Sequence, residues 1–371
     1  MGDLGLDWDE LEGDRGLGKV LSVRAIEELG RTVVAVGSVG RQYGWDEYER
    51  VWRSTTGTEW ESIQSLASGD VVDSGSAWST QLVVAQDRFV LVRAYQGGGG
   101  NVFTSKDGAN WRAANTDFGD SQLVGVGVTD GTIVTATYDG GLWTSADGID
   151  WSWTAPSSDT PAAVAAFVSA GSELIAFDFG SPEVDTTGPT TAWSTTDGRS
   201  WRRIGTLPGS GGPGYFSAAA IGDTVVAVSA PNDWSNARLA WIRQGVEWVP
   251  LANAPEGVFW LFPTSFGLVG IGNCLDDTWN PDFSDPDESN GVTWLSRDGS
   301  NWSLVEQPEP FGKHIEAVFE DGSRLIGLGM DSIRYYDRKP AGAVWVSPLP
   351  ADPSIWLDAS LEYHANVCAD I

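Results

Sequence analysis

Short apolar runs rich in Val, Ala and Ile recur along the whole chain, and each is broken after a few residues by Gly, Asp or Ser. Two such runs joined by a small polar turn form “LVGVGVTDGTIVTATY” from Leu123, and the arrangement returns in “SAAAIGDTVVAVSA” from Ser217 and “EAVFEDGSRLIGLGM” from Glu316. Runs of this length bounded by turn residues predict β-strands paired as hairpins. No convincing amphipathic helix precedes about the last twenty residues, so the pattern predicts an all-β fold.

A second hairpin follows these pairs and carries a repeated phrase of eight residues. The phrase is “TSKDGANW” ending at Trp111, “TSADGIDW” at Trp151, “STTDGRSW” at Trp201 and “LSRDGSNW” at Trp302. Related segments end at Trp60 and Trp248, and the six tryptophans follow one another at intervals of 51, 40, 50, 47 and 54 residues. An aromatic residue stands eight positions before five of them and seven before the sixth: Trp52, Phe103, Trp143, Trp193, Trp294 and, before Trp248, Trp241. This spacing predicts a strand, a tight turn and a returning strand.

Two hairpins make a unit of four antiparallel strands and roughly 45 residues, which is typical of a β-propeller blade. The last unit, from about Ile315, ends with “GAVWVSP” around Trp345 and has no closing tryptophan. “GLDWDEL”, residues 5–11, has the form of a closing segment but no strands before it. We therefore expect the strand around Trp8 to complete the last blade, which closes a seven-bladed ring over residues 1–348 and removes exposed sheet edges. Residues 349–371 are expected to form a tail packed on the propeller.

The repeated phrase resembles the Ser-x-Asp-x-Gly-x-x-Trp box of the Asp-box (BNR-repeat) propeller families, with one residue fewer between Asp and Trp. Four of the seven units keep the Asp-Gly pair. We interpret these residues as structural, because a side chain that serves in every blade cannot mark a single active site. If the resemblance extended to sialidase activity, it would imply six blades, an arginine triad and an Arg-Ile-Pro signature. The nearest match to that signature, “RRIGTLP” from Arg202, follows a closing tryptophan and so lies in a different place.

The connections between second and third strands vary greatly, whereas the Asp-Gly turns are uniform. Variable loops on a rigid scaffold are where binding sites usually lie, and these loops share one predicted face. Trp and Tyr beside Asp, Asn and Arg suit a glycan or a protein, because the rings stack on apolar patches while polar neighbours form hydrogen bonds. The alternative is that several of these rings pack over the blade ends. The residues predicted to bind a ligand are Arg41, Trp45, Tyr48, Tyr95, Trp234, Trp279, Tyr335 and Tyr336.

The sequence therefore predicts an extracellular recognition module that binds a glycan or a protein. A glycoside hydrolase of sialidase-like type and an architectural ectodomain without a ligand are the alternatives. No catalytic residue is assigned, since no GxSxG, HExxH or P-loop motif occurs and paired carboxylates mean little where acidic residues are so frequent.

Charge and composition narrow the partners. The net charge is −29, with 51 acidic against 22 basic residues, which repels nucleic acid and anionic lipid. No apolar run is long enough to cross a membrane. We expect the protein to be a monomer. We also expect it to be secreted or displayed on the cell surface, with a cytoplasmic location as the alternative. No cofactor or metal is predicted. Two histidines are too few for a zinc site. The acidic segment 276–288 is expected to be a solvated loop, and calcium binding by its carboxylates is the open alternative. Cys274 and Cys368 form either a disulfide or two buried thiols.

Overall fold

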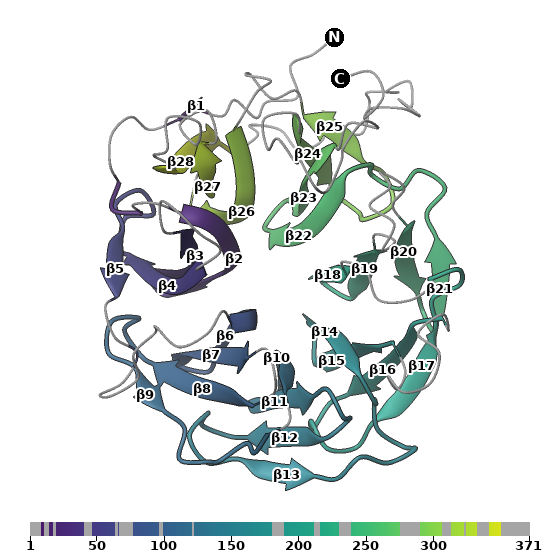
Figure 1. The fold of residues 1–371 in the computed structure, drawn as a ribbon. Coiled ribbons are helices and arrows are strands. Elements are labelled where there is room, and N and C mark those ends of the chain that lie inside the picture. The colour runs from purple at the N-terminus through teal and green to yellow at the C-terminus, as the bar shows by residue number, and fades with distance from the viewer. Residues whose placement is uncertain are drawn as a thin grey trace. The chain divides into compact units, whose positions relative to one another are not determined.

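A computed structural model of the chain describes residues 9–10, 15–17, 20–40, 47–63, 66, 77–95, 99–120, 122–179, 189–210, 216–229, 239–274, 290–305, 313–322, 324–331 and 341–349. All regular secondary-structure elements within these residues are β-strands (Figure 1). They form seven four-stranded antiparallel sheets, which are the blades of a β-propeller. The predicted fold class is therefore confirmed.

The chain divides into two compact units. One comprises Val23–Pro213 and Gln244–Trp248, and it contains most of the first four blades. Blade 1 consists of β2 (Val20–Leu29), β3 (Thr32–Gly40), β4 (Glu47–Ser54) and β5 (Glu61–Ile63), and blade 2 of β6 (Ala77–Ala85), β7 (Arg88–Tyr95), β8 (Gly100–Ser105) and β9 (Arg112–Ala113). Blade 3 consists of β10 (Leu123–Thr129), β11 (Thr132–Thr137), β12 (Leu142–Ser145) and β13 (Ser152–Thr154), and blade 4 of β14 (Val164–Ala170), β15 (Glu173–Asp178), β16 (Thr191–Thr195) and β17 (Arg202–Thr206).

The other unit comprises Met1–Ser22, Gly214–Arg243 and Val249–Ile371. Blade 5 consists of β18 (Phe216–Ile221), β19 (Thr224–Ser229), β20 (Leu239–Gln244) and β21 (Glu247–Pro250). Blade 6 consists of β22 (Val258–Thr264), β23 (Gly267–Cys274), β24 (Asn290–Ser296) and β25 (Ser303–Val305). Blade 7 consists of β26 (Lys313–Asp321), β27 (Arg324–Asp331), β28 (Ala341–Pro348) and β1 (Asp9–Glu10).

The first strand of the chain is the fourth strand of the last blade. β1 pairs antiparallel with β28, with Asp9 opposite Val346 and Glu10 opposite Trp345. The prediction that the N-terminal segment completes the final sheet is confirmed, while Trp8 itself lies outside the described residues. The tail from residue 350 onward also lies outside them, so its packing stays a prediction.

The second strand of a blade is buried along almost its whole length. In β11, β15 and β19 every residue after the first is buried. A strand between two neighbours in its own sheet, with other sheets packed on both faces, needs apolar residues on both sides. This explains why “TVVAVS” in β19 shows no alternation of apolar and polar residues.

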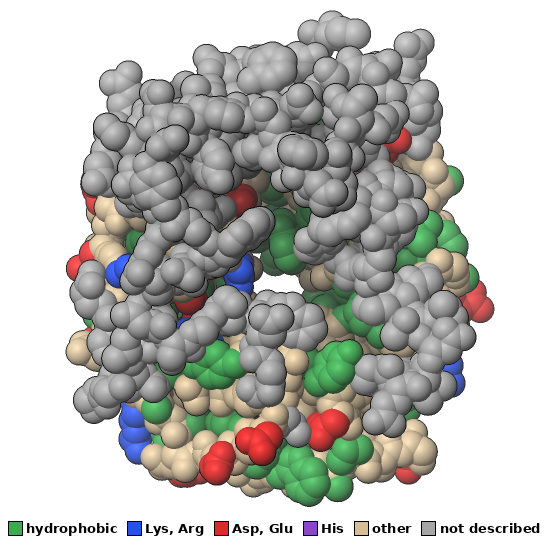
Figure 2. Space-filling view, viewed as in Figure 1, with side chains coloured by type: hydrophobic (Ala, Val, Ile, Leu, Met, Phe, Trp, Pro, Cys, Tyr) green, Lys and Arg blue, Asp and Glu red, His purple; other side chains and the backbone are tan. Residues whose placement is uncertain are grey.

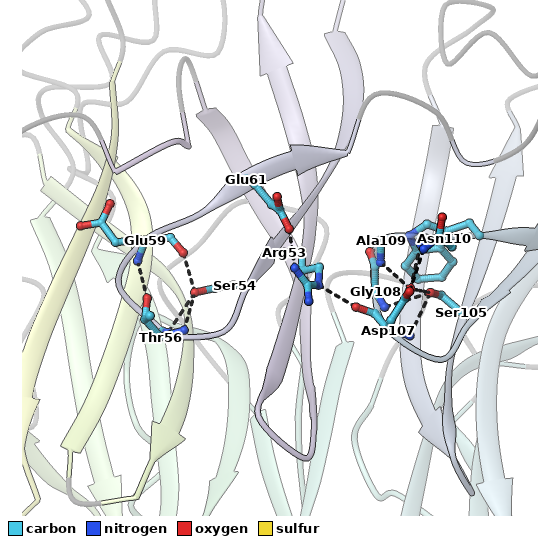
Figure 3. A network of polar contacts seen from close by, with 12 residues as sticks. Arg53, Ser54, Thr56, Glu59, Glu61, Ser105, Asp107, Gly108, Ala109 and Asn110 are labelled. Carbon is cyan, nitrogen blue, oxygen red and sulfur yellow. Dashed lines mark hydrogen bonds and ion pairs between the residues drawn. The ribbon is translucent and has the colours of Figure 1, made fainter.

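Each Asp-Gly turn is built by hydrogen bonds within itself. In blade 2 the hydroxyl oxygen of Ser105 accepts the N–H of Gly108 at 2.9 Å, and a carboxylate oxygen of Asp107 accepts the N–H of Asn110 at 2.8 Å (Figure 3). The indole N–H of Trp111 donates to the Gly108 carbonyl at 2.9 Å. The three side chains that repeat in the sequence therefore satisfy backbone groups of one corner, which is a local structural role.

These hydrogen bonds lower the pKa of the carboxyl groups. The N–H of Asn110 is the main cause that holds the pKa of Asp107 well below its ordinary value of 3.8, and the N–H of Ser200 lowers the pKa of Asp197 to about 2. In the two remaining Asp-Gly turns partial burial opposes the effect, but backbone N–H bonds outweigh it and lower the pKa of Asp147 and Asp298.

Blades without the Asp-Gly pair form the corner in other ways. In blade 1 the hydroxyl oxygen of Thr56 accepts the N–H of Glu59 at 3.0 Å, so a hydroxyl takes the place of the carboxylate (Figure 3). In blade 5 only Gly245 and Val246 separate β20 from β21, and Gly245 has a φ of +64°. This shorter turn explains why the aromatic residue stands seven rather than eight positions before Trp248.

The glycine of each Asp-Gly turn lies against the preceding blade. A Cβ on Gly108 would lie 2.7 Å from Cγ2 of Val34 in blade 1, and a Cβ on Gly148 would lie 2.6 Å from Cγ2 of Thr104 in blade 2. Both glycines have a φ of +73°. The closing tryptophans pack beside them in the apolar clusters between blades, where Trp111 and Trp151 are buried. Glycine is therefore required both by the backbone conformation and by the lack of space.

Glu27 is a carboxyl group in one of these apolar interfaces. It lies in β2 between Ala25 and Leu29, which belong to the same strand face and pack against the cluster that includes Val34 and Leu82. Burial raises the pKa of Glu27 from its ordinary value of 4.5 to about 8. The protonated, uncharged form is therefore favoured in the folded protein.

We expect Gly148→Ala to lower the free energy of unfolding by about 2–4 kcal/mol, because it adds overpacking against Thr104 to the cost of a positive φ. Gly30→Ala is the matched control, since Gly30 has a φ of +66° and nothing within 4 Å of the added Cβ. The control should lose only about 1 kcal/mol. Urea denaturation of the two variants measures the difference, and equal losses would contradict a steric role for Gly148.

We expect the stability of the protein to fall as pH rises from about 4.5 to about 8, because the folded state holds the proton on Glu27 more tightly than the unfolded state does. Glu27→Gln removes this dependence. The free energy of unfolding of the variant should exceed that of the parent by about 1–3 kcal/mol at pH 8 and by almost nothing at pH 4. The expected gain at pH 8 is smaller than the full pKa difference implies, because the half-buried side chain is partly solvated. Thermal melts of both proteins across this pH range measure it, and parallel curves would show that Glu27 is not the cause.

Candidate functional site

The described residues contain one part of the predicted binding face. Tyr95 is described with its side chain, and Tyr48 lies in β4 without a described side chain. The segment 276–288 lies outside the described residues, as do the other six predicted ligand-binding residues: Arg41, Trp45, Trp234, Trp279, Tyr335 and Tyr336. We call the end of a blade that carries its second-to-third connection the loop end, and the site built here lies at the loop ends of blades 2 and 3.

Tyr95 is held in place by two neighbours. It is the last residue of β7 rather than part of the predicted loop, and the side-chain amide of Asn101 at the start of β8 donates to its hydroxyl oxygen at 3.0 Å. The guanidinium carbon of Arg93 lies 5.5 Å from the centre of its ring. Arg93 and Tyr95 are two residues apart on one strand, so both project to the same face of the sheet. The ring is held at its edge and at its face, so the side chain would lose less conformational entropy when a ligand binds.

Arg93 belongs to a buried ion pair that links two blades. Its Nε lies against Oε2 of Glu49 in β4, and the side chains of Arg93 and Glu49 are only 3% and 4% exposed. The hydroxyl of Thr80 in β6 donates to the other carboxylate oxygen of Glu49. Neither residue of the pair was predicted from the sequence to be part of the site. The available signal was a single arginine inside the apolar run “FVLVRAY”, where a charge must find a partner.

The connection from blade 2 to blade 3 joins several segments into one surface. The N–H of Gly99, just before β8, donates to the carbonyl of Asp120 at 2.8 Å, and the N–H of Tyr138, just after β11, donates to the carbonyl of Gln122 at 2.8 Å. Just before the acceptors of these two bonds in the chain, Phe118 packs edge-on against Trp143 with ring centres 5.1 Å apart. The connection is therefore anchored by its backbone and by a buried ring. We call Tyr95, residues 99–101, 117–120 and 122 and the turn 138–141 the platform.

The platform is aromatic and acidic. Tyr138 is 43% exposed, and Asp117, Asp120 and Asp139 are exposed carboxylates. The single arginine that supports the platform, Arg93, is buried, so its charge is offset by Glu49 inside the protein. Such a surface offers flat rings and hydrogen-bond acceptors to a ligand.

The described residues hold no group of three His, Cys, Asp or Glu side chains that could bind a metal ion. Arg50 in β4 donates to the hydroxyl of Ser62 within blade 1 at 3.1 Å. Within the described ranges there is also no helix long and apolar enough to span a membrane.

No protein-family model matches the chain, and no curated protein matches it either. The chain is similar in structure to a computationally designed protein, Ika8, with a TM-score of 0.51 and 12% identity over 90% of this chain and 98% of that one. It is also similar to YCF48 bound to D1 peptide (TM-score 0.54, 11% identity, 95% and 97% covered) and to streptogramin B lyase (TM-score 0.59, 7% identity, 94% and 100% covered). At these identities the similarity establishes the propeller fold alone.

We expect Glu49→Leu to lower the free energy of unfolding by about 3–5 kcal/mol, because it leaves Arg93 buried without a counter-charge. The double variant Glu49→Leu with Arg93→Met should recover most of this loss. Glu61→Leu is the matched control, because Glu61 pairs with Arg53 but is 59% exposed, and it should lose at most about 1 kcal/mol. Denaturant unfolding of the set measures these values, and a loss for Glu49→Leu as small as that of the control would show that the pair contributes little.

Proposed function

We propose that this protein is a recognition module that binds a protein partner through the loop ends of blades 2 and 3. The observation that carries the proposal is the platform, where a fixed ring, Tyr95, and an exposed ring, Tyr138, are set on backbone held by hydrogen bonds. Tyrosines contribute much of the energy at protein interfaces because they present a large rigid ring with a polar tip. A surface that is ordered before binding loses less entropy when the partner arrives.

The comparison with YCF48 supports a polypeptide as the ligand, since that propeller is described as bound to a peptide. At 11% identity this support means only that a propeller fold can bind a peptide, and it does not indicate which residues of this chain would bind one. An extracellular setting, which was expected from the sequence, is proposed together with the recognition role. Glycan binding, which the sequence analysis also expected, is distinguished from peptide binding by the experiment below.

We expect linear peptides selected from a random phage-displayed library to bind the protein, and their affinity to fall about tenfold or more in Tyr138→Ala, which removes an exposed ring from the platform. Val246→Ala is the control, because Val246 is 66% exposed in a third-to-fourth strand turn, at the end of its blade opposite the loop end, and should leave binding unchanged. Thermal melts confirm that each variant is folded. A glycan array run with the same proteins is the alternative readout.

Selected peptides that bind both variants as well as the parent would contradict the assignment of the platform. Glycan binding that depends on Tyr138, with no peptide selected, would replace the protein partner by a sugar.

A further inference from the structure

Trp153 is the most exposed tryptophan among the described residues. It lies in β13, the outermost strand of blade 3, and is 56% exposed. Its cross-strand partner is Trp143, with ring centres 6.4 Å apart and an angle of 49° between the rings. Trp143 in turn packs against Phe118 of the platform. A half-buried aromatic base therefore supports the exposed indole.

Trp153 also adjoins the loop end of its blade. A Cβ on Gly141 would lie 2.8 Å from Nε1 of Trp153, so the indole rests on the turn 138–141 that carries Tyr138 and Asp139. A Cβ on Gly140 would lie 2.7 Å from the carbonyl oxygen of Ala162, which places the connection carrying Asp159 beside the same turn. Both Asp139 and Asp159 are exposed. We call Tyr138, Asp139, Trp153 and Asp159 the blade 3 patch.

The charge around this patch has one sign. No Lys or Arg occurs between Arg112 and Arg199, whereas Asp and Glu recur throughout that stretch. Figure 2 shows hydrophobic and acidic side chains together over β12 and β13, with no Lys or Arg side chain among them on this view. An exposed indole and phenol flanked by carboxylates match the requirements of a bound cation, because the ring face attracts positive charge and the carboxylates form hydrogen bonds with it.

We propose that the blade 3 patch binds a Lys- or Arg-bearing extended segment of the protein partner. This deepens the proposed function and rests on it. The outer edge of β13 is the edge of its sheet, so an extended segment can lie along Ser152–Thr154 and project alternate side chains onto Trp153 and the acidic turn. Charge complementarity selects a basic partner, and the exposed rings determine where on the acidic surface it binds.

The probes are two short peptides that alternate Lys or Glu with Thr, measured by fluorescence anisotropy against the full chain. The Lys peptide should bind and the Glu peptide should not, and binding should weaken strongly at about 1 M salt. Trp153→Ala should weaken binding of the Lys peptide by about tenfold, and Asp139→Asn with Asp159→Asn should have a similar effect. Trp153→Phe should retain most of the affinity, since it keeps an aromatic face. Thermal melts show whether each variant is folded.

The matched control is Asp130→Asn with Asp223→Asn. Both residues are exposed in turns between first and second strands, so the double variant removes the same charge at the opposite ends of blades. It should bind the Lys peptide like the parent protein. Equal weakening by the control and the patch variants, or full binding by Trp153→Ala, would show only general attraction by the acidic surface and would overturn the proposal. If library peptides bind through Tyr138 but are neutral and indifferent to Trp153, the recognition role stands and the basic partner is wrong.

Discussion

The contact between a turn glycine and the neighbouring sheet is the constraint on which the blade packing depends. Gly148 approaches Thr104 and Gly299 approaches Val226 so closely that a Cβ would lie 2.6 and 2.5 Å from a methyl carbon. Sheets can approach to this distance only where no side chain stands between them. The closing tryptophan then fills the space beside the glycine, as Trp151 does in the cluster between blades 2 and 3. Long polar side chains add bonds to the same corners, for example Arg88, which donates to the carbonyl of Asp147 at 3.0 Å.

This constraint explains why the most repetitive part of the sequence is the least informative about function. The carboxylate of Asp107 accepts N–H groups of its own turn, and Thr56 performs the same task in blade 1 with a hydroxyl. What recurs is therefore a geometry that several side chains can supply. Residues used for such a corner have their hydrogen-bonding capacity occupied, and the low pKa of Asp107 and Asp197 reflects this.

The loop ends of blades 2 and 3 are not built from a repeated turn. Here the buried pair of Arg93 and Glu49 offsets charge within the protein, so that the rings above it and the surrounding exposed carboxylates define the surface. A buried pair of this kind contributes little net stability compared with apolar residues, yet it fixes the side chains around it. The aromatic platform and the blade 3 patch are continuous through Phe118 and Trp143, so one ordered base supports both proposed contacts.

The sequence by itself determined the all-β class, the seven four-stranded units and the sharing of one sheet by the two ends of the chain. It could do so because strand length, turn residues and the tryptophan spacing are local properties that repeat, as the pairing of Glu10 with Trp345 bears out. Only the tertiary structure decided that Glu49 lies buried against Arg93, that Glu27 lies in an apolar interface, and that Trp153 is exposed beside Tyr138. These facts depend on which residues of different strands and blades come into contact. Glu49 and Arg93 are 44 positions apart in the chain, and no local sequence pattern predicts that their side chains form an ion pair.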